Sequence, residues 1–460
     1  MSPADGAVRP VPRVAYERWL DSLARAGWPA AGDRGADDRN TSEGRVDEPV
    51  AVGDALGRVT AGPVVARWPS PRTDCAAMDG IAVRGADLAA APVVSCAEGL
   101  PEDATAGGQA LRLTAGLFEW IDTGDPMPAG ADTVILRERL LPQADGSIVI
   151  TAAADGPEIG QRPGYGARGR NVRTAGEDFR AGQTLVPAGT RLRPGDLAAA
   201  AAGGHVTVTV ARRPAVAIIP TGDEIRPVGT VPRFGDIIDT NSLMLAARCR
   251  QLGAVPLVSA VVPDDPDSLA VEVRRAAGQA DLVLVIAGSS RGRGDHAAAV
   301  LAQVGGVAVA GVAVRPGHPA LLGHAKRPAA SHGRPAGAHA AQRNGIAPVI
   351  GLPGYPLAAA VIFELFGVPM LGALTGQATS RDPVRARLDR DWSSPVDVEN
   401  WVLVTLAPGA AGGVPVATPA NRGASSISQL ARADAWWPIP AGQGAFTSGT
   451  QIEVIPLPGG

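Results

Sequence analysis

The sequence is poor in cysteine, in aromatic side chains and in any excess of one charge sign, and each shortage excludes a class of protein. Three cysteines occur in 460 residues, without the close pairing typical of zinc or redox sites. We therefore expect a reduced, cytoplasmic protein with structural cysteines. The formal net charge of −3 supplies no basic field for phosphate backbones, so no nucleic-acid partner is expected.

The sequence is also expected to lack an apolar segment long enough to enter a membrane. Charged residues interrupt the first twenty positions, among them Asp5, Arg9 and Glu17, and this pattern is unlike a secretory leader. The apolar runs are expected to fall short of the roughly 20 residues that cross a bilayer, so no membrane association is predicted.

What the chain does have is length and apolar content. Hydrophobic residues make up 45% of it, which is typical of globular proteins. Because single cores rarely grow beyond roughly 250 residues, we expect at least three domains.

Local patterns change along the chain. An amphipathic helix is predicted over residues 13–28, a polar loop over 29–47, and strands and turns over 50–150. From residue 214 to 287 the order strand, helix, strand, helix, strand implies a parallel sheet covered by helices. Residues 324–345 lack periodicity and are interpreted as a surface excursion. After residue 382, short strands predict a small β-barrel or sandwich.

Three glycine-containing loops follow predicted strands of the parallel sheet, at residues 221–224, 288–295 and 351–356. Ligands of open parallel sheets bind at the carboxyl ends of the strands, so these loops should meet along one edge. Glycines allow close approach of an anion, and a following helix N-terminus attracts it. The pattern predicts a phosphate-bearing ligand.

Carboxylates recur beside glycines in several loops, and with a phosphorylated ligand they suggest Mg²⁺. Two of them have a structural alternative. Asp265 precedes Pro266 and is interpreted as a helix N-cap, and Asp295 has the same alternative. The other candidates are Asp79, Asp178, Glu224 and Asp264.

Four histidines gather in a short stretch, but their spacing matches neither a helical metal pair nor a zinc finger. We interpret them as solvated side chains rather than as metal ligands. They are His318, His324, His332 and His339.

The motifs, taken in order, resemble the molybdopterin molybdenumtransferase family of the MoeA and gephyrin E-domain type. The resemblance runs from about residue 50 to the C-terminus. The matching pieces are AMDGIAVR (77–84), TGDPMPAGAD (123–132), NVR (171–173) with GED (176–178), TGDE (221–224), GDIIDTNS (235–242), RPGHP (315–319) and GLPGYP (351–356).

The resemblance implies a multidomain α/β plus β fold in four parts. A linker domain is expected from residues 10–68 and 159–213, with a β-rich domain inserted at 69–158. A three-layer α/β molybdopterin-binding domain with a parallel-rich sheet is expected at 214–380, and a β-barrel-like domain at 381–460. The family also implies a homodimer whose active cleft lies between the α/β domain of one subunit and the inserted domain of the other.

The implied reaction inserts molybdenum from molybdate into adenylylated molybdopterin with release of AMP, assisted by Mg²⁺. Molybdopterin adenylyltransferase and recipient molybdoenzymes are the implied partners. The implied catalytic residues are Asp79, Thr123, Asp178, Glu224 and Asp295, with Asp79, Glu224 and Asp264 as metal ligands. Cofactor binding is assigned to Gly288, Ser289, Ser290, Arg291, Arg293, Gly294, Arg315, His318, Pro353, Gly354 and Pro356.

The chain departs from the family pattern at the second glycine loop, which has the sequence AGSSRGRG at residues 287–294. Arg315 and His318 stand where lysines are usual, and Tyr355 replaces an asparagine. These departures leave an alternative from another class: a non-catalytic carrier, scaffold or regulator that binds molybdopterin. The retained acids favour the enzyme, and the altered loop favours the alternative.

Overall fold

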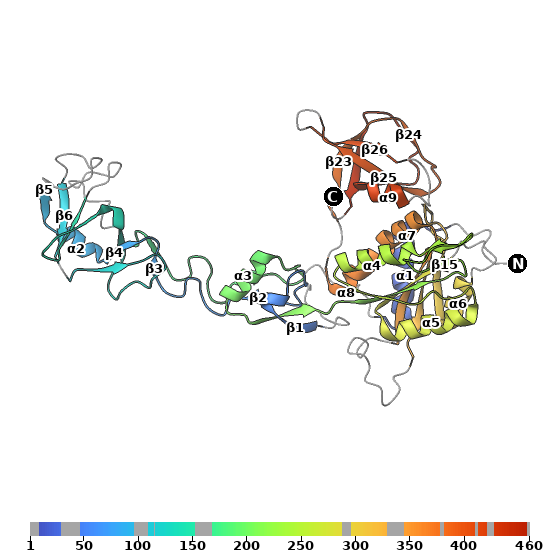
Figure 1. The fold of residues 1–460 in the computed structure, drawn as a ribbon, viewed down its shortest axis with the longest axis horizontal. Coiled ribbons are helices and arrows are strands. Elements are labelled where there is room, and N and C mark those ends of the chain that lie inside the picture. The colour runs from blue at the N-terminus through green and yellow to red at the C-terminus, as the bar shows by residue number, and fades with distance from the viewer. Residues whose placement is uncertain are drawn as a thin grey trace.

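The computed structural model shows four units arranged as a body with a long arm (Figure 1). An α/β unit and a β-barrel form the body, a small linker unit adjoins it, and a β-rich unit lies at the far end of the arm. The description covers residues 9–28, 47–95, 109–114, 116–151, 168–287, 296–328, 345–377, 381–409, 413–420 and 427–457. Most of the predicted loop at 29–47 and of the excursion at 324–345 lies outside these ranges.

The α/β unit has a six-stranded sheet in the order β17-β14-β18-β22-β21-β19. Its first four strands are parallel, as predicted. Along β14, Val216 and Ile218 pack into one hydrophobic core, while Ala217 and Ile219 pack into the other. Helices cover both faces, so this unit has three layers. The strands are β14 (Ala215–Pro220), β17 (Val255–Val258), β18 (Leu282–Ala287), β19 (Gly305–Ala310), β21 (Leu321–Lys326) and β22 (Ile346–Pro353).

One strand near the edge of this sheet corrects the sequence prediction. Strand β21 was not predicted, and His324 belongs to it rather than to the excursion assigned to residues 324–345. It pairs antiparallel with both β22 and β19, so the sheet is mixed. The helices on one face are α5 (Pro266–Gln279) and α6 (Ala297–Val304), and α4 (Thr240–Gln251) lies on the other.

The predicted N-terminal helix is present as α1 (Pro12–Arg25), but it packs with the α/β unit rather than with the linker strands. Ala15, Trp19 and Leu23 recur every four residues and are fully buried on the sheet. The indole nitrogen of Trp19 also donates a 2.8 Å hydrogen bond to the carbonyl of Gly323. The helix therefore does not belong with the first linker stretch expected at 10–68.

A continuous helix of 20 residues, Pro356–Thr375, corrects the expectation that apolar runs are short. By length and composition it could cross a membrane, but 72% of its most apolar window is buried inside the protein. It consists of α7 (Pro356–Ile362), the π-helical turn η3 (Phe363–Gly367) and α8 (Val368–Thr375). Its one carboxylate, Glu364, is paired with Arg248 and Arg381.

The linker unit joins two stretches of chain. Strand β1 (Asp47–Ala51) pairs with β13 (Thr207–Ala211), and β2 (Val64–Val65) pairs with β12 (Thr184–Val186). Helix α3 (Pro194–Ala202) and the short helix η1 (Val52–Asp54) pack beside them. Their shared core is small and consists mainly of valines, leucines and alanines.

The unit at the end of the arm is built from short antiparallel strands, in the sheets β7-β4-β8 and β5-β6-β10-β9 and the pair β3-β11. Its elements are β3 (Cys75–Ala76), β4 (Gly80–Val83), α2 (Gly85–Ala90), β5 (Val93–Ser95), β6 (Gln109–Leu113), β7 (Phe118–Ile121), β8 (Thr133–Leu136), η2 (Arg137–Arg139), β9 (Leu140–Pro142), β10 (Ile148–Ile150) and β11 (Val172–Arg173).

The C-terminal unit is a barrel rather than a sandwich, because β25 pairs with both β26 and β27 and thereby closes the sheet. Strand β20 (Val314–Arg315) of the α/β unit pairs parallel with β25, which joins the two units of the body. The elements are β23 (Val384–Leu388), β24 (Trp392–Ser393), β25 (Glu399–Ala407), β26 (Val416–Pro419), α9 (Ile427–Arg432), β27 (Ala435–Ile439), β28 (Ala445–Phe446) and β29 (Gln451–Pro456).

Candidate active site

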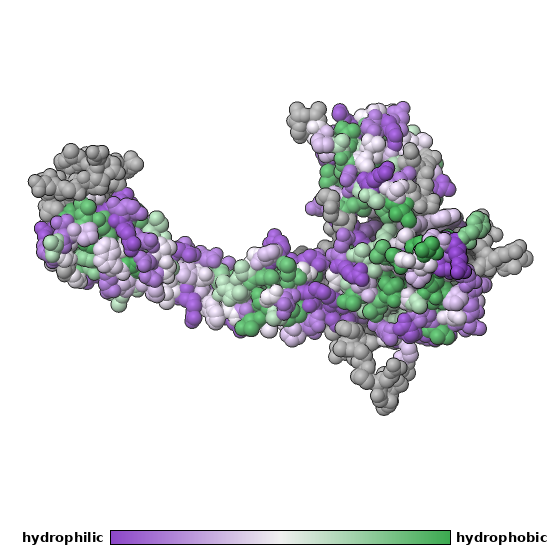
Figure 2. Space-filling model, in the orientation of Figure 1, coloured by the Kyte–Doolittle hydropathy of each residue, from purple (hydrophilic) through white to green (hydrophobic). Residues whose placement is uncertain are grey.

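A cleft of about 990 Å³ opens at the carboxyl ends of the parallel strands. Pro220, Ile286 and Pro353, near the ends of β14, β18 and β22, form its floor. The barrel supplies the opposite wall, and Figure 2 shows apolar residues gathered on the visible face of the α/β unit below the barrel. The position agrees with the sequence prediction that the loops meet at this edge of the sheet.

Six of the predicted site residues line this cleft: Glu224, Arg315, His318, Pro353, Gly354 and Pro356. They come from three separate segments of the sequence, which lie around residues 224, 315–318 and 353–356. The structure therefore brings the first and third predicted loops and the 315–319 segment together on one surface.

The second predicted loop begins in the cleft, since Ala287 at the end of β18 lines it. The residues that follow lie outside the described part of the chain, and helix α6 begins at Ala297 with His296 in the N-cap position. The predictions that fall on this undescribed stretch are Gly288, Ser289, Ser290, Arg291, Arg293, Gly294 and Asp295.

The conformation of the first loop requires a glycine beside the predicted acid. Gly222 has a φ of +134°, and a Cβ atom there would lie 2.9 Å from Oε2 of Glu224. A side chain at this position would both strain the backbone and displace the carboxylate. Asp223 accepts a 3.3 Å hydrogen bond from the backbone N–H of Asp264, which is not among the residues that line the cleft.

The N-terminus of helix α4 lines the cleft, although its residues were not among the predicted site residues. Asp239 caps the helix by accepting a 2.9 Å hydrogen bond from the N–H of Ser242. Asn241 donates a 2.7 Å hydrogen bond to the carbonyl of Gly354 and so ties two loops of the cleft together. Its own Oδ1 is buried and accepts no hydrogen bond from the described residues. The only available signal was the GDIIDTNS motif itself.

The barrel wall of the cleft was also missed. It is lined by Trp392 of β24 and by Asn400 and Trp401 of β25. The Trp401 indole donates a 2.6 Å hydrogen bond to Glu399, whose pKa is raised by burial and partly lowered again by this bond. Nothing in the local sequence separates these side chains from those that fill the barrel.

At the end of the arm, Asp79 and Thr123 form a second candidate group. Oδ1 of Asp79 accepts 2.7 Å hydrogen bonds from both the hydroxyl and the backbone N–H of Thr123. These bonds lower the pKa of the exposed Asp79 carboxyl, and the nearby positive charge of Arg137 acts in the same direction. Asp79 is therefore held ionised.

Asp178 belongs to a loop that folds back onto the same region. Strand β11 pairs with β3, and the N–H of Gly124 bonds to the carbonyl of Ala76 at 2.9 Å. The N–H of Ala175 bonds to Asp74 at 2.8 Å, and the N–H of Asp178 bonds to the carbonyl of Ser70 at 3.0 Å. The three acid-bearing loops thus gather around the β3-β11 pair, with Asp178 exposed.

The two groups of residues lie toward opposite ends of the elongated molecule, one on the arm and one in the body (Figure 1). Asp79, Thr123 and Asp178 sit on the arm, whereas Glu224 lines the cleft in the body. Within the described ranges, no three His, Cys, Asp or Glu side chains come together as a metal site. The predicted set Asp79, Glu224 and Asp264 therefore does not converge within a single chain.

Two further predictions can be placed. Asp265 is an N-cap, as interpreted: it accepts a 2.8 Å hydrogen bond from the N–H of Ser268, and the hydrogen bonds from Ser268 lower its pKa. His318 lines the cleft, whereas His324 lies in β21, half-buried, with a pKa lowered by burial. His332 and His339 lie outside the described residues.

Comparison with known proteins agrees with this arrangement. Family models match in chain order: the MoeA N-terminal region (domains I and II) at residues 30–204, a probable molybdopterin-binding domain at 217–373, and the MoeA C-terminal region (domain IV) at 385–457. A solved structure of a molybdopterin biosynthesis MoeA protein from Pyrococcus horikosii aligns with a TM-score of 0.71 at 26% identity, over 98% of this chain and 99% of that one.

Curated relatives match over nearly the same length. A molybdopterin molybdenumtransferase of Nostoc is 30% identical over 88% of this chain and 87% of its own. Molybdopterin molybdenumtransferase 2 of Mycobacterium tuberculosis is 31% identical over 89% of this chain and 94% of its own. The fold and cleft define a multidomain protein of the MoeA type. The chain belongs to the molybdopterin molybdenumtransferase family.

Proposed function

We infer that this protein is a molybdopterin molybdenumtransferase, which inserts molybdenum from molybdate into adenylylated molybdopterin and releases AMP. The observation that carries this inference is the cleft, in which Glu224, Arg315, His318 and the 353–356 loop meet at the carboxyl ends of the parallel strands. The names of the curated relatives support the same reaction. We place it in the cytoplasm, between molybdopterin adenylyltransferase and the recipient molybdoenzymes.

The described residues suit the substrates chemically. Trp392 and Trp401 offer flat apolar surfaces for a pterin ring, and the N-terminus of α4, where Asp239 already bonds to the N–H of Ser242, lies in the same lining. Arg315 lies where a cationic group would offset the repulsion between molybdate and a phosphorylated pterin, and His318 lines the same cleft.

We further propose that the protein works as a homodimer in which the arm of one subunit faces the cleft of the other. This arrangement is supported by the separation of Asp79, Thr123 and Asp178 from Glu224 along the molecule (Figure 1). Carboxylates and substrate phosphates are the ligands that Mg²⁺ prefers. Asp79 and Glu224 from two subunits would hold the ion, which would neutralise charge on the phosphoanhydride when bound. Asp264 is set aside, because it does not line the cleft.

The loop at residues 288–295 keeps its proposed role in holding the phosphate, on the evidence of its sequence and of its origin in the cleft at Ala287. Arg291→Ala and Arg293→Ala should each weaken binding of a phosphorylated pterin. The loss should shrink as salt is added, since exposed ionic contacts are screened. Isothermal titration at low and high salt measures both effects, and unchanged affinity at low salt would exclude the arginines.

The test of the function is AMP release from adenylylated molybdopterin with molybdate, with and without Mg²⁺. We expect release above a no-enzyme control, and a loss of rate on chelation. The composite site is tested by mixing Asp79→Asn and Glu224→Gln subunits, each of which should be strongly impaired alone. A mixed dimer contains one cleft with both acids intact, so activity should return. Intact pterin binding without AMP release would leave the carrier or scaffold alternative instead.

A further inference from the structure

One arginine crosses the joint between the arm and the body. Arg191 of the linker unit donates from Nη1 to the carbonyl of Gly57 at 2.8 Å, within its own unit. From Nη2 it donates to the carbonyl of Leu252 at 3.2 Å and to Oε1 of Gln377 at 2.7 Å, both in the α/β unit. A single guanidinium therefore connects three separate segments across two units.

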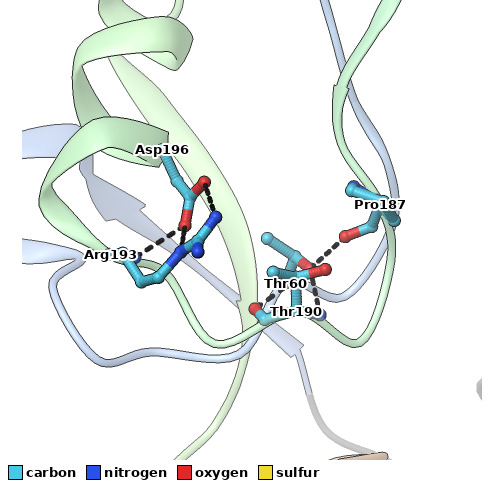
Figure 3. A network of polar contacts seen from close by, with 5 residues as sticks. All are labelled: Thr60, Pro187, Thr190, Arg193 and Asp196. Atoms are coloured by element: carbon cyan, nitrogen blue, oxygen red, sulfur yellow. Dashed lines mark hydrogen bonds and ion pairs between the residues drawn. The ribbon is translucent and has the colours of Figure 1, made fainter.

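The loop that carries Arg191 is fixed on the linker side (Figure 3). The Thr60 hydroxyl donates to the carbonyl of Pro187 at 2.7 Å and accepts from the N–H of Thr190 at 3.0 Å. Two residues beyond Arg191, Arg193 bonds to Asp196 through its backbone and its side chain. Arg191 thus projects from a loop that is pinned on both sides.

On the body side, Arg191 meets the C-terminal ends of two helices. Leu252 is the C-cap of α4, and Gln377 follows Gly376, the left-handed C-cap of α8. The carbonyl end of a helix carries partial negative charge, which favours a cation there. The N-terminal ends of the same two helical segments, at Asn241 and Pro356, line the cleft.

The joint has little free space. A Cβ atom at Gly253 would lie 3.3 Å from Nη1 of Arg191, and one at Gly189 would lie 3.2 Å from the carbonyl oxygen of Gly376. Burial lowers the pKa of Arg191, which is consistent with a guanidinium held between packed backbone segments. A shorter or rotated side chain could not satisfy the same three acceptors.

We propose that Arg191 is a positioning residue: it sets the angle between the arm and the body, and thereby places the Asp79 group of one subunit at the cleft of the other. This proposal rests on the composite site of the proposed function. Arg191 does not line the cleft, and it acts by fixing the position of a remote acid. Lysine would keep the charge but not the forked geometry.

The first experiment measures the angle directly and does not depend on activity. Spin labels are placed at two exposed sites, Glu119→Cys on β7 of the arm and Val271→Cys on α5 of the body, in a Cys96→Ser background. Labelled subunits are diluted with unlabelled protein so that pulsed electron resonance reports the distance within one chain. Arg191→Gln should broaden or shift the distribution, and Arg191→Lys should do so partly. Arg193→Gln should not, because it removes only a side-chain bond within the linker unit and keeps the backbone hydrogen bond to Asp196 that pins the loop.

The second experiment uses the mixed dimers. In a dimer of Asp79→Asn and Glu224→Gln subunits, the intact cleft takes its arm from the Glu224→Gln chain. Arg191→Gln in that chain should lower kcat/KM by roughly tenfold to a hundredfold, since small displacements of catalytic groups cost this much. The same substitution in the Asp79→Asn chain, which supplies the cleft but not the arm, should have little effect.

The outcomes separate the alternatives. An unchanged distance distribution in Arg191→Gln overturns the proposal, as does an equal loss of activity whichever chain carries the substitution, because Arg191 would then act on the helices of the cleft. If Arg191→Gln does not fold, Gln377→Leu removes one acceptor across the joint and should show the same effects in smaller measure. If the unsubstituted mixed dimer is inactive, the composite site fails, and the distance measurement still decides whether Arg191 sets the angle.

Discussion

At the scale of single residues, the informative comparison is between two aspartates of the arm with the same local chemistry. Asp79 accepts hydrogen bonds from the hydroxyl and N–H of Thr123, and Asp145 accepts the same pair from Ser147. Both are exposed, and in both the pKa is lowered first by the side-chain hydrogen bond. They differ in location, since Asp145 lies in the turn between β9 and β10.

Asp79→Asn should reduce kcat by about 100-fold, the loss typical of removing one preorganised electrostatic contact. The melting temperature should hardly change, because the side chain is exposed and Asn keeps an acceptor for Thr123. Asp145→Asn is the matched control and should retain full activity. Equal activity of the two variants would remove Asp79 from the site.

Thr123 supplies the largest contribution to the low pKa of Asp79, through its hydroxyl. That hydrogen bond stabilises the charged form, so Thr123→Val should raise the pKa toward the ordinary value of an aspartate. The acid limb of kcat/KM, where it reports Asp79, should therefore move to higher pH. Carboxyl carbon NMR titration checks the shift, and Thr123→Ser, which keeps the hydroxyl, should restore it.

At the scale of elements, the packing of the long helix Pro356–Thr375 depends on the ion pairs of its one carboxylate, Glu364. Glu364 accepts from Arg248 at 2.7 and 3.2 Å and from Arg381 at 2.6 Å, with 13% of its side chain exposed. Partial burial of these three charged groups is tolerated because they bond to one another. The network also connects α4 to the segment that leads into the barrel.

Glu364→Ala should destabilise the body by about 2–3 kcal/mol, less than the loss of a fully buried ion pair because the three groups are partly exposed. Glu17→Ala is the comparison, because Glu17 pairs with Arg13 one turn along α1, with 56% and 88% of the two side chains exposed. It should cost no more than about 1 kcal/mol. Urea unfolding followed by tryptophan fluorescence measures both, and similar costs would mean that the Glu364 network contributes no more than a surface pair.

Some elements of the α/β unit could be predicted from their sequence patterns, and others could not. Strands β14 and β18 are buried on both faces and therefore appear as unbroken apolar runs, which made the parallel part of the sheet predictable. Strand β21 has the sequence LLGHAK, in which glycine, histidine and lysine interrupt the apolar pattern, so the strand was not predicted. Helix α1 was recognised from its apolar stripe, but a stripe does not reveal which surface it will cover.

At the scale of the whole molecule, the sequence predicted which loops of the α/β unit meet, because parallel strands present their carboxyl ends along one edge. It could not predict the barrel wall, since the contact of Trp392 and Trp401 with the cleft arises only when two units pack together. Nor could the joint at Arg191 be foreseen, because its acceptors are backbone carbonyls at Gly57 and Leu252 and one glutamine. Backbone acceptors leave no pattern in the sequence.

Because the arm of one subunit is proposed to complete the cleft of another, activity per subunit should depend on protein concentration. If each cleft is completed by the arm of a second subunit, a single chain has no complete site, and activity must follow the dimer population. Light scattering at micromolar concentration should give twice the 46.6 kDa of one chain. On dilution, AMP release per subunit should fall in parallel with the mean mass, and adding inactive Glu224→Gln subunits, which still supply an intact arm, should restore it. Constant activity per subunit after dissociation to monomers would show that one chain completes its own site.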